Sequence, residues 1–198
     1  MDLTFTASEE AFAAEVRSWL AEHVEHPGPF GSVDDEVDWG RSWQATMAAA
    51  RMLAISWPDS VGGRDASPVE VALYNMEYAR SGAPQPINRV GISHVGPTLL
   101  ARGTLQQQQR WMPAILDASE LWCQLFSEPD AGSDLAALRA RAEPTEGGWL
   151  VSGQKVWTSY ARHATWGIAL VRTDSDSPRH SGISVSYTHL TLPTIYSV

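Results

Sequence analysis

The residues best suited to chemistry lie in one short stretch, Phe126 to Asp134, which reads FSEPDAGSD. Its Pro, Asp and Gly residues are typical of tight turns, so we expect an extended segment to end at Phe126 and a turn to follow. Backbone N–H groups of such a turn, together with the hydroxyls of Ser127 and Ser133, could cradle an anion such as a pyrophosphate. Ordinary connecting turns have the same composition, and on composition alone we favour that simpler interpretation.

The cysteine and the histidines give weaker indications. Cys123 is the only cysteine, so an intramolecular disulfide is impossible and a reducing compartment is favoured. In an apolar stretch, a lone cysteine is more often a small buried residue than a catalytic thiol. His94, His163 and His180 lack metal-ligand spacing with one another and with carboxylates, so we predict no metal site.

Composition sets the broad class of the protein. The 198 residues are 43% hydrophobic and 19% charged, an ordinary globular balance that argues against disorder. The net charge of -9 and the absence of a Lys/Arg cluster argue against nucleic acid or an anionic membrane as a partner. The N-terminus lacks a signal-peptide pattern, and no apolar run reaches the roughly 20 residues that span a bilayer. We therefore predict a cytoplasmic protein.

The elements that must position these residues change in type along the chain. The first part has helical periodicity, beginning with capping-box spacing at Thr6 and Glu9. Further helices are predicted at about 37–54, 68–81, 92–101 and 105–116. Pro68 suits the first turn of the third of these five helices.

After Ser119 the pattern is typical of strands. LWCQLF and WGIALVRT are apolar runs of strand length, and GGWLVSGQKVWTSY predicts two strands about a turn at Ser152-Gly153. Helices followed by strands indicate an α+β protein, with a helical domain over 1–119 and a β domain over 120–184.

Two segments in this order resemble the signature of the acyl-CoA dehydrogenase family: LWCQLFSEPDAGSDLAALRARA, followed by GGWLVSGQKVWTS. Upstream, GPTLLARGTLQQQQRWMPAIL resembles the helices that precede the signature, and the resemblance runs from about residue 5 to about residue 183. It implies an N-terminal all-helical domain followed by a β-barrel-like middle domain, which is incomplete here. The C-terminal four-helix domain of the family is absent from this chain.

The resemblance also implies an activity. Family members hold FAD and oxidise an acyl-CoA thioester to the trans-2-enoyl-CoA, as part of fatty acid metabolism. A carboxylate removes the α-proton while the flavin accepts the β-hydride, and an electron-transfer flavoprotein accepts the electrons. The catalytic base is a Glu of the C-terminal domain, so we expect no catalytic residue in this chain and no activity from it alone. The full-length protein is expected to be a homo-oligomer, a dimer or tetramer.

Two other interpretations stay open on the sequence. An acyl-CoA oxidase or a flavin monooxygenase could use the same fold. A non-catalytic helical interaction module is the alternative from another class.

The resemblance assigns cofactor contacts to eight residues: Gln124, Phe126, Ser127, Gly132, Ser133, Trp157, Thr158 and Ser159. Ser133 is also expected to touch the acyl-CoA substrate. Trp157 matches the aromatic residue packed over the flavin, the alternative being an ordinary core tryptophan. Asp130 and Tyr160 stand where the family more often has Gly and a small residue. Glu128 fits the signature, and its expected role is to tie the turn to a neighbouring backbone N–H.

The C-terminal residues, VSYTHLTLPTIYSV, lose the family pattern. Val185 to Thr194 can be back-translated as a string that resembles a transposase adapter used in DNA sequencing libraries. We therefore predict that residues 185–198 are a non-native tail, translated from adapter sequence.

Overall fold

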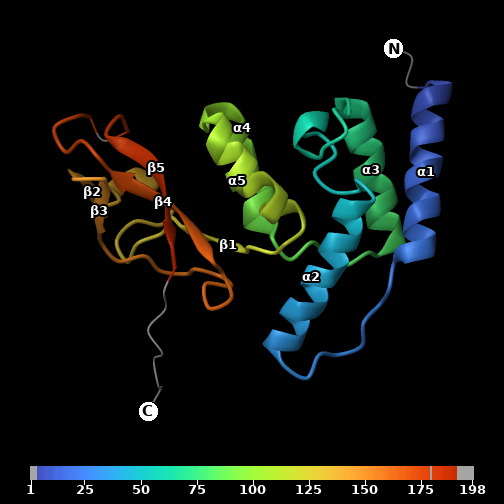
Figure 1. Cartoon of the computed structure of the whole chain (residues 1–198), viewed down its shortest axis with the longest axis horizontal. Coiled ribbons are helices and arrows are strands. Elements are labelled where there is room, and N and C mark those ends of the chain that lie inside the picture. Colours follow the sequence, from blue (N-terminus) through green and yellow to red (C-terminus); the bar gives the residue numbers. More distant parts are fainter. Residues whose placement is uncertain (1–3, 179, 191–198) are drawn as a thin grey trace. The chain divides into compact units, whose positions relative to one another are not determined.

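A computed structural model describes residues 4–178 and 180–190. The chain divides between Ser119 and Glu120 into two compact units, each described here by itself. Helices occupy the first unit and a mixed sheet the second, which confirms the α+β class (Figure 1). Among the described residues, no helix has the length and apolar character needed to cross a membrane.

The helical unit contains α1 (Ala7–His23), α2 (Val33–Ala49), α3 (Pro68–Ser81), α4 (Gly96–Arg102) and α5 (Leu105–Leu116). The capping box of Thr6 and Glu9 is present at the start of α1, and Pro68 occupies the first turn of α3, as predicted. α1 packs along α3 (Figure 1), and the buried carboxylate of Glu77 on α3 accepts two hydrogen bonds of 2.9 Å from Arg17 on α1.

Two predicted helices have different bounds. α2 begins at Val33 because the hydroxyl of Ser32 accepts the Asp35 N–H at 3.1 Å and caps the helix. It ends at Ala49 instead of 54, because Arg51 and Ala54 take positive φ angles of 57° and 48°. The segment predicted as one helix over 92–101 is a π-helical turn, Gly91–Val95, that continues into α4.

Gln44 is a buried polar residue that joins α2 to α5. Its side-chain amide donates to the carbonyls of Ile115 at 2.8 Å and Leu116 at 3.0 Å. Its side-chain oxygen accepts the backbone N–H of Asn88 at 2.8 Å. These three backbone groups lie near the C-terminal end of α5 and in the segment before α4, so one side chain satisfies polar groups of two segments in the helical core.

We expect Gln44→Leu to destabilise the helical unit by about 2 kcal/mol. A leucine of similar volume removes the side-chain partner of the Leu116 carbonyl and of the Asn88 N–H, while the Ile115 carbonyl still accepts from the Asn88 side chain. Chemical denaturation followed by helical circular dichroism measures the loss. Ser42→Ala on the exposed face of the same helix is the control and should leave stability nearly unchanged. A Gln44→Leu protein as stable as the parent would contradict the assignment.

The sheet unit is built on β4 (Trp166–Arg172), which is buried along most of its length. β1 (Trp122–Leu125) pairs with β4 in parallel, and β5 (Ile183–His189) pairs with it antiparallel. β2 (Arg141–Thr145) meets β4 at one parallel pair and forms a hairpin with β3 (Gly148–Ser152). A small core of Ala140, Ala142, Ala169 and Val171 lies on this sheet, with Leu125 packed against it.

The hairpin differs from the prediction of two strands about Ser152-Gly153. Its strands are β2 and β3, and the turn lies at Glu146-Gly147, where Gly147 takes a φ of 86°. The segment after Ser152 leaves the sheet, since residues 153–158 belong to no helix or strand. The prediction missed β2 because its sequence, RAEPT, contains a proline and charged residues that are unfavourable in strands.

Candidate functional site

The turn after β1 has a rigid base and an exposed tip. Glu128 and Ala131 form a backbone bridge, with N–H to carbonyl distances of 3.0 and 3.1 Å. Ala131 is buried, whereas Gly132 and Ser133 are exposed. The bridge therefore presents the backbone of Gly132 and the hydroxyl of Ser133 to the outside, where a ligand can meet them.

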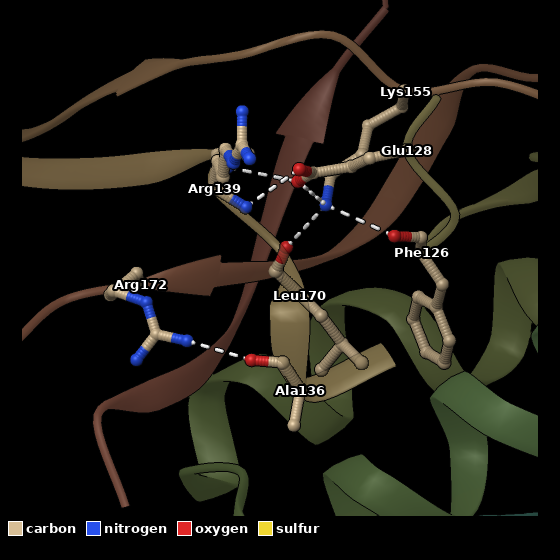
Figure 2. Close-up of polar contacts among 8 residues, drawn as sticks. Phe126, Glu128, Ala136, Arg139, Lys155, Leu170 and Arg172 are labelled. Atoms are coloured by element: carbon tan, nitrogen blue, oxygen red, sulfur yellow. Dashed lines mark hydrogen bonds and ion pairs between the residues drawn. The ribbon is translucent and has the colours of Figure 1, made fainter. Parts of the chain in front are cut away.

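Glu128 holds this turn to the next segment of the chain. Its carboxylate accepts the backbone N–H of Arg139 at 2.6 Å and that of Ala140 at 2.9 Å (Figure 2). The prediction that Glu128 ties the turn to a neighbouring backbone N–H is confirmed. Burial raises the pKa of the carboxyl, but the hydrogen bonds from Lys155, Arg139 and Ala140 outweigh it, so the pKa lies below its ordinary value.

Lys155 completes the same network and was not among the predicted site residues. Its ammonium lies 2.8 Å from Oε1 of Glu128 and donates to the carbonyls of Phe126 at 3.1 Å and Leu170 at 2.7 Å (Figure 2). A signal was present, because Lys155 is the one lysine in a chain whose other basic residues are all arginine. Its three acceptors surround one nitrogen, an arrangement that suits the compact ammonium of lysine.

Trp157 follows this network along the chain. Trp157 is 90% exposed, so it does not pack in the core of the sheet unit. The backbone N–H of Val156 donates to the carbonyl of Ser127 at 2.9 Å, which brings the Trp157 segment beside the end of β1. Trp157 also takes a φ of 59°, a conformation that is strained for a bulky residue and is found preferentially at functional sites.

The other predicted contacts lie on these two segments. Gln124 is half-buried on β1 opposite Ile168, and Phe126 and Ser127 are half-buried at the strand end. Thr158 is half-buried and Ser159 is exposed, directly after Trp157. The structure thus joins the Phe126–Ser127 strand end to the Trp157 segment through backbone hydrogen bonding. Gly132 and Ser133 are held to the same strand end by the Glu128 bridge.

The two residues that depart from the family pattern, Asp130 and Tyr160, lie on the surface. Asp130 lies on the surface, 3.5 Å from the exposed guanidinium of Arg139, so its carboxylate points to solvent. Tyr160 is exposed and takes a positive φ of 57° in the turn after Ser159.

The remaining reactive side chain is not available for nucleophilic chemistry. Cys123 is fully buried on β1, which confirms its prediction as a small buried residue. Burial raises the pKa of its thiol to about 11, so the thiolate is scarce at neutral pH. Within residues 4–178 and 180–190, no group of His, Cys, Asp and Glu side chains is arranged to hold a metal ion.

The donor set fits a planar aromatic cofactor. An exposed indole ring offers a face for stacking, and the neighbouring strand end and turn offer hydroxyls and backbone polar groups for the edge of a ring. This combination is what binding of a flavin requires: apolar area for the ring faces and fixed polar groups at the ring edge.

Two family models match the chain. The N-terminal domain of acyl-CoA dehydrogenase matches residues 6–119, and the middle domain matches residues 123–196. The chain therefore belongs to the acyl-CoA dehydrogenase family, whose members are FAD-dependent oxidoreductases.

Relatives agree with this assignment. The acyl-CoA dehydrogenase IpdE1 of Mycobacterium tuberculosis is 41% identical over 194 residues, which cover 94% of this chain and 50% of that protein. The ChsE4-ChsE5 complex from Mycobacterium tuberculosis has a TM-score of 0.78 at 31% identity, covering 96% of this chain and 48% of the other. The Tcur3481-Tcur3483 steroid ACAD has a TM-score of 0.76 at 29% identity, with coverages of 96% and 49%. The chain spans about half the length of these relatives.

Proposed function

We propose that this chain supplies the helical domain and the flavin-facing surface of an FAD-dependent acyl-CoA dehydrogenase that converts an acyl-CoA thioester to the trans-2-enoyl-CoA. The observation that carries the proposal is Trp157, an almost fully exposed tryptophan in a strained conformation beside the Phe126–Ser127 strand end. A side chain with so much apolar area in water is stabilised by a flat partner.

The residues of this chain bind and orient in this proposal. Trp157 covers one face of the ring, while the hydroxyls of Ser127 and Ser159 and nearby backbone groups meet its polar edge. Ser133, at the exposed tip of the turn, contacts the acyl-CoA. FAD, when bound, supplies the hydride acceptor. The base that takes the α-proton is proposed to be a Glu outside this chain.

The relatives suggest the class of substrate and partner. One similar structure is described as a steroid ACAD and another as a complex of two named chains, ChsE4 and ChsE5. We therefore propose a bulky, steroid-like acyl-CoA as substrate and an oligomer of dehydrogenase chains as the assembly. An electron-transfer flavoprotein is the proposed acceptor, and the cytoplasm the proposed location.

Trp157→Ala tests the flavin assignment in the protein expressed from the complete open reading frame. We expect the dissociation constant for FAD to rise about tenfold through loss of ring stacking, with little change in the unfolding midpoint because the side chain is exposed. Fluorescence titration of the apoprotein with FAD measures the affinity.

Trp149→Ala is the matched control, because Trp149 is also an exposed tryptophan of the sheet unit but lies on β3. It should leave FAD affinity unchanged. Equal losses in the two variants, or no loss in Trp157→Ala, would refute the assignment. Slow reoxidation of the substrate-reduced flavin by air distinguishes a dehydrogenase from an oxidase or monooxygenase of the same fold.

We also propose that residues 185–198 are translated adapter sequence. Residues 185–189 lie in β5, where they pair with β4, and the middle-domain match extends to residue 196. The match argues against the expected loss of the family pattern after Ser184, so the proposal rests on the back-translated string alone. Residues 191–198 lie outside the described part of the chain. Genomic DNA read across the codon of Ser184 decides the matter: a continuous, adapter-free reading frame that encodes VSYTHLTLPT would contradict the proposal.

A further inference from the structure

The ammonium of Lys155 is shared among three segments of the sheet unit. Its acceptors are a carbonyl at the end of β1, a carbonyl in the middle of β4 and the carboxylate of Glu128 in the turn (Figure 2). An ammonium has three N–H donors, and here each has an acceptor within 3.1 Å. The pair is shielded from water, since the side chains of Lys155 and Glu128 are 11% and 7% exposed.

The arrangement of the acceptors explains why the residue is lysine. They converge on one nitrogen from different directions, which suits the compact, rotatable ammonium. A guanidinium distributes its five N–H donors over three nitrogens in a rigid plane. No single one of these nitrogens can donate to three acceptors that lie in different directions. Lys155 is the one lysine among the 14 Lys and Arg residues of the sequence, and the geometry of its acceptors accounts for a lysine at this position.

The network is directly connected to the flavin-facing surface. Lys155 holds the Phe126 carbonyl, and the next residue, Val156, donates its backbone N–H to the Ser127 carbonyl. Trp157 follows immediately. Residues 153–158 belong to no helix or strand, so the place of Trp157 depends on such individual contacts and not on a ladder of backbone bonds.

We propose that the Lys155–Glu128 pair is a positioning element for cofactor binding, which fixes Trp157 against the Phe126–Ser127 strand end. The proposal rests on the proposed function and deepens it. Two residues, Lys155 and Glu128, would set the affinity for the flavin by holding the backbone beside Trp157. The proposal also gives a role to a buried ion pair, since such a pair as a whole is often no more stabilising than apolar residues of similar volume.

The test uses the protein from the complete open reading frame and three variants. Lys155→Arg keeps the charge, and the double variant Lys155→Met with Glu128→Gln removes both charges together, which avoids an unpaired buried charge. Arg139→Met is the control, because it removes a positive side chain from the same neighbourhood whose own ion pair is exposed. FAD affinity is measured by fluorescence titration, and hydrogen exchange is measured on the peptide that contains Val156.

We expect Lys155→Arg and the double variant each to raise the dissociation constant for FAD about tenfold, and to speed exchange of the Val156 amide by a similar factor. Peptides of the β2–β3 hairpin should exchange at parent rates, which shows that the sheet unit retains its fold, and peptides of α1 and α3 report the same for the helical unit. Arg139→Met should behave like the parent. A purely structural role predicts instead that Lys155→Arg retains parent affinity.

Parent affinity and parent exchange in both altered proteins would overturn the proposal. Failure of the proposed function has a different signature, in which the parent itself does not bind FAD. Exchange then still decides the positioning of Trp157: a faster Val156 amide in Lys155→Arg supports it, and an unchanged one refutes it.

Discussion

The 198-residue chain supplied with FAD, an acyl-CoA and an electron acceptor is expected to form no detectable trans-2-enoyl-CoA, whereas the protein from the complete open reading frame does. The chain spans about half the length of its relatives. We propose that the catalytic Glu belongs to the part of the family's length that this chain does not cover. A general base contributes about 10²- to 10⁴-fold to such a proton transfer. Product is measured by the absorbance of the enoyl thioester.

The comparison with the complete protein is also the control for substrate and acceptor. Addition of free carboxylate, such as formate, to the 198-residue chain should not restore turnover, because positioning is lost together with the base. Enoyl-CoA formation by the chain alone at a rate near that of the complete protein would contradict the placement of the base.

Glu128→Ala is expected to destabilise the sheet unit by about 3 to 5 kcal/mol. The change leaves the buried Lys155 ammonium without its carboxylate and leaves the N–H groups of Arg139 and Ala140 without an acceptor. Hydrogen exchange of peptides from β1 and β4 in the complete protein measures the loss locally. Asp130→Ala is the matched control, because Asp130 lies two residues after Glu128 and its carboxylate is exposed. This variant should have little effect on hydrogen exchange.

The same group predicts a dependence on pH. Because the pKa of Glu128 is lower in the folded than in the unfolded protein, its stabilising contribution is fully present above the unfolded value of about 4.3. It is lost as the pH falls through the folded pKa. In Glu128→Gln, the free energy of unfolding of the sheet unit should therefore depend less on pH in the acidic range than in the parent. An unchanged dependence on pH would argue against the ion pair.

The helical unit could be predicted well because its signals are local. The capping residue Thr6 and the first-turn Pro68 fix helix starts through neighbours in the sequence, and both predictions are confirmed. The end of α2 was predicted too far along the chain. Arg51 and Ala54 take left-handed conformations, and neither is the glycine from which such a conformation is usually predicted. Such conformations are stabilised by tertiary contacts, which a pattern of residue types does not contain.

The sheet unit was predicted less completely. Apolar runs located β1 and β4, but β2 carries Pro144 and Glu143 and was missed. Its strand conformation is set by pairing with β3 and not by propensity.

The candidate site divides in the same way. The turn residues and Trp157 were predicted from resemblance, and Glu128 was correctly given its tying role. Lys155 was missed because its importance lies in three acceptors that are distant in sequence. The one feature of the sequence that distinguishes this residue is that no other lysine occurs in the chain.

The most direct measurement is a structure of the complete protein with FAD bound. We expect the flavin ring to lie against Trp157, with its polar edge toward Phe126 and Ser127, and the Lys155 ammonium still to join Phe126 and Glu128. A flavin bound away from Trp157 and from this strand end would contradict it.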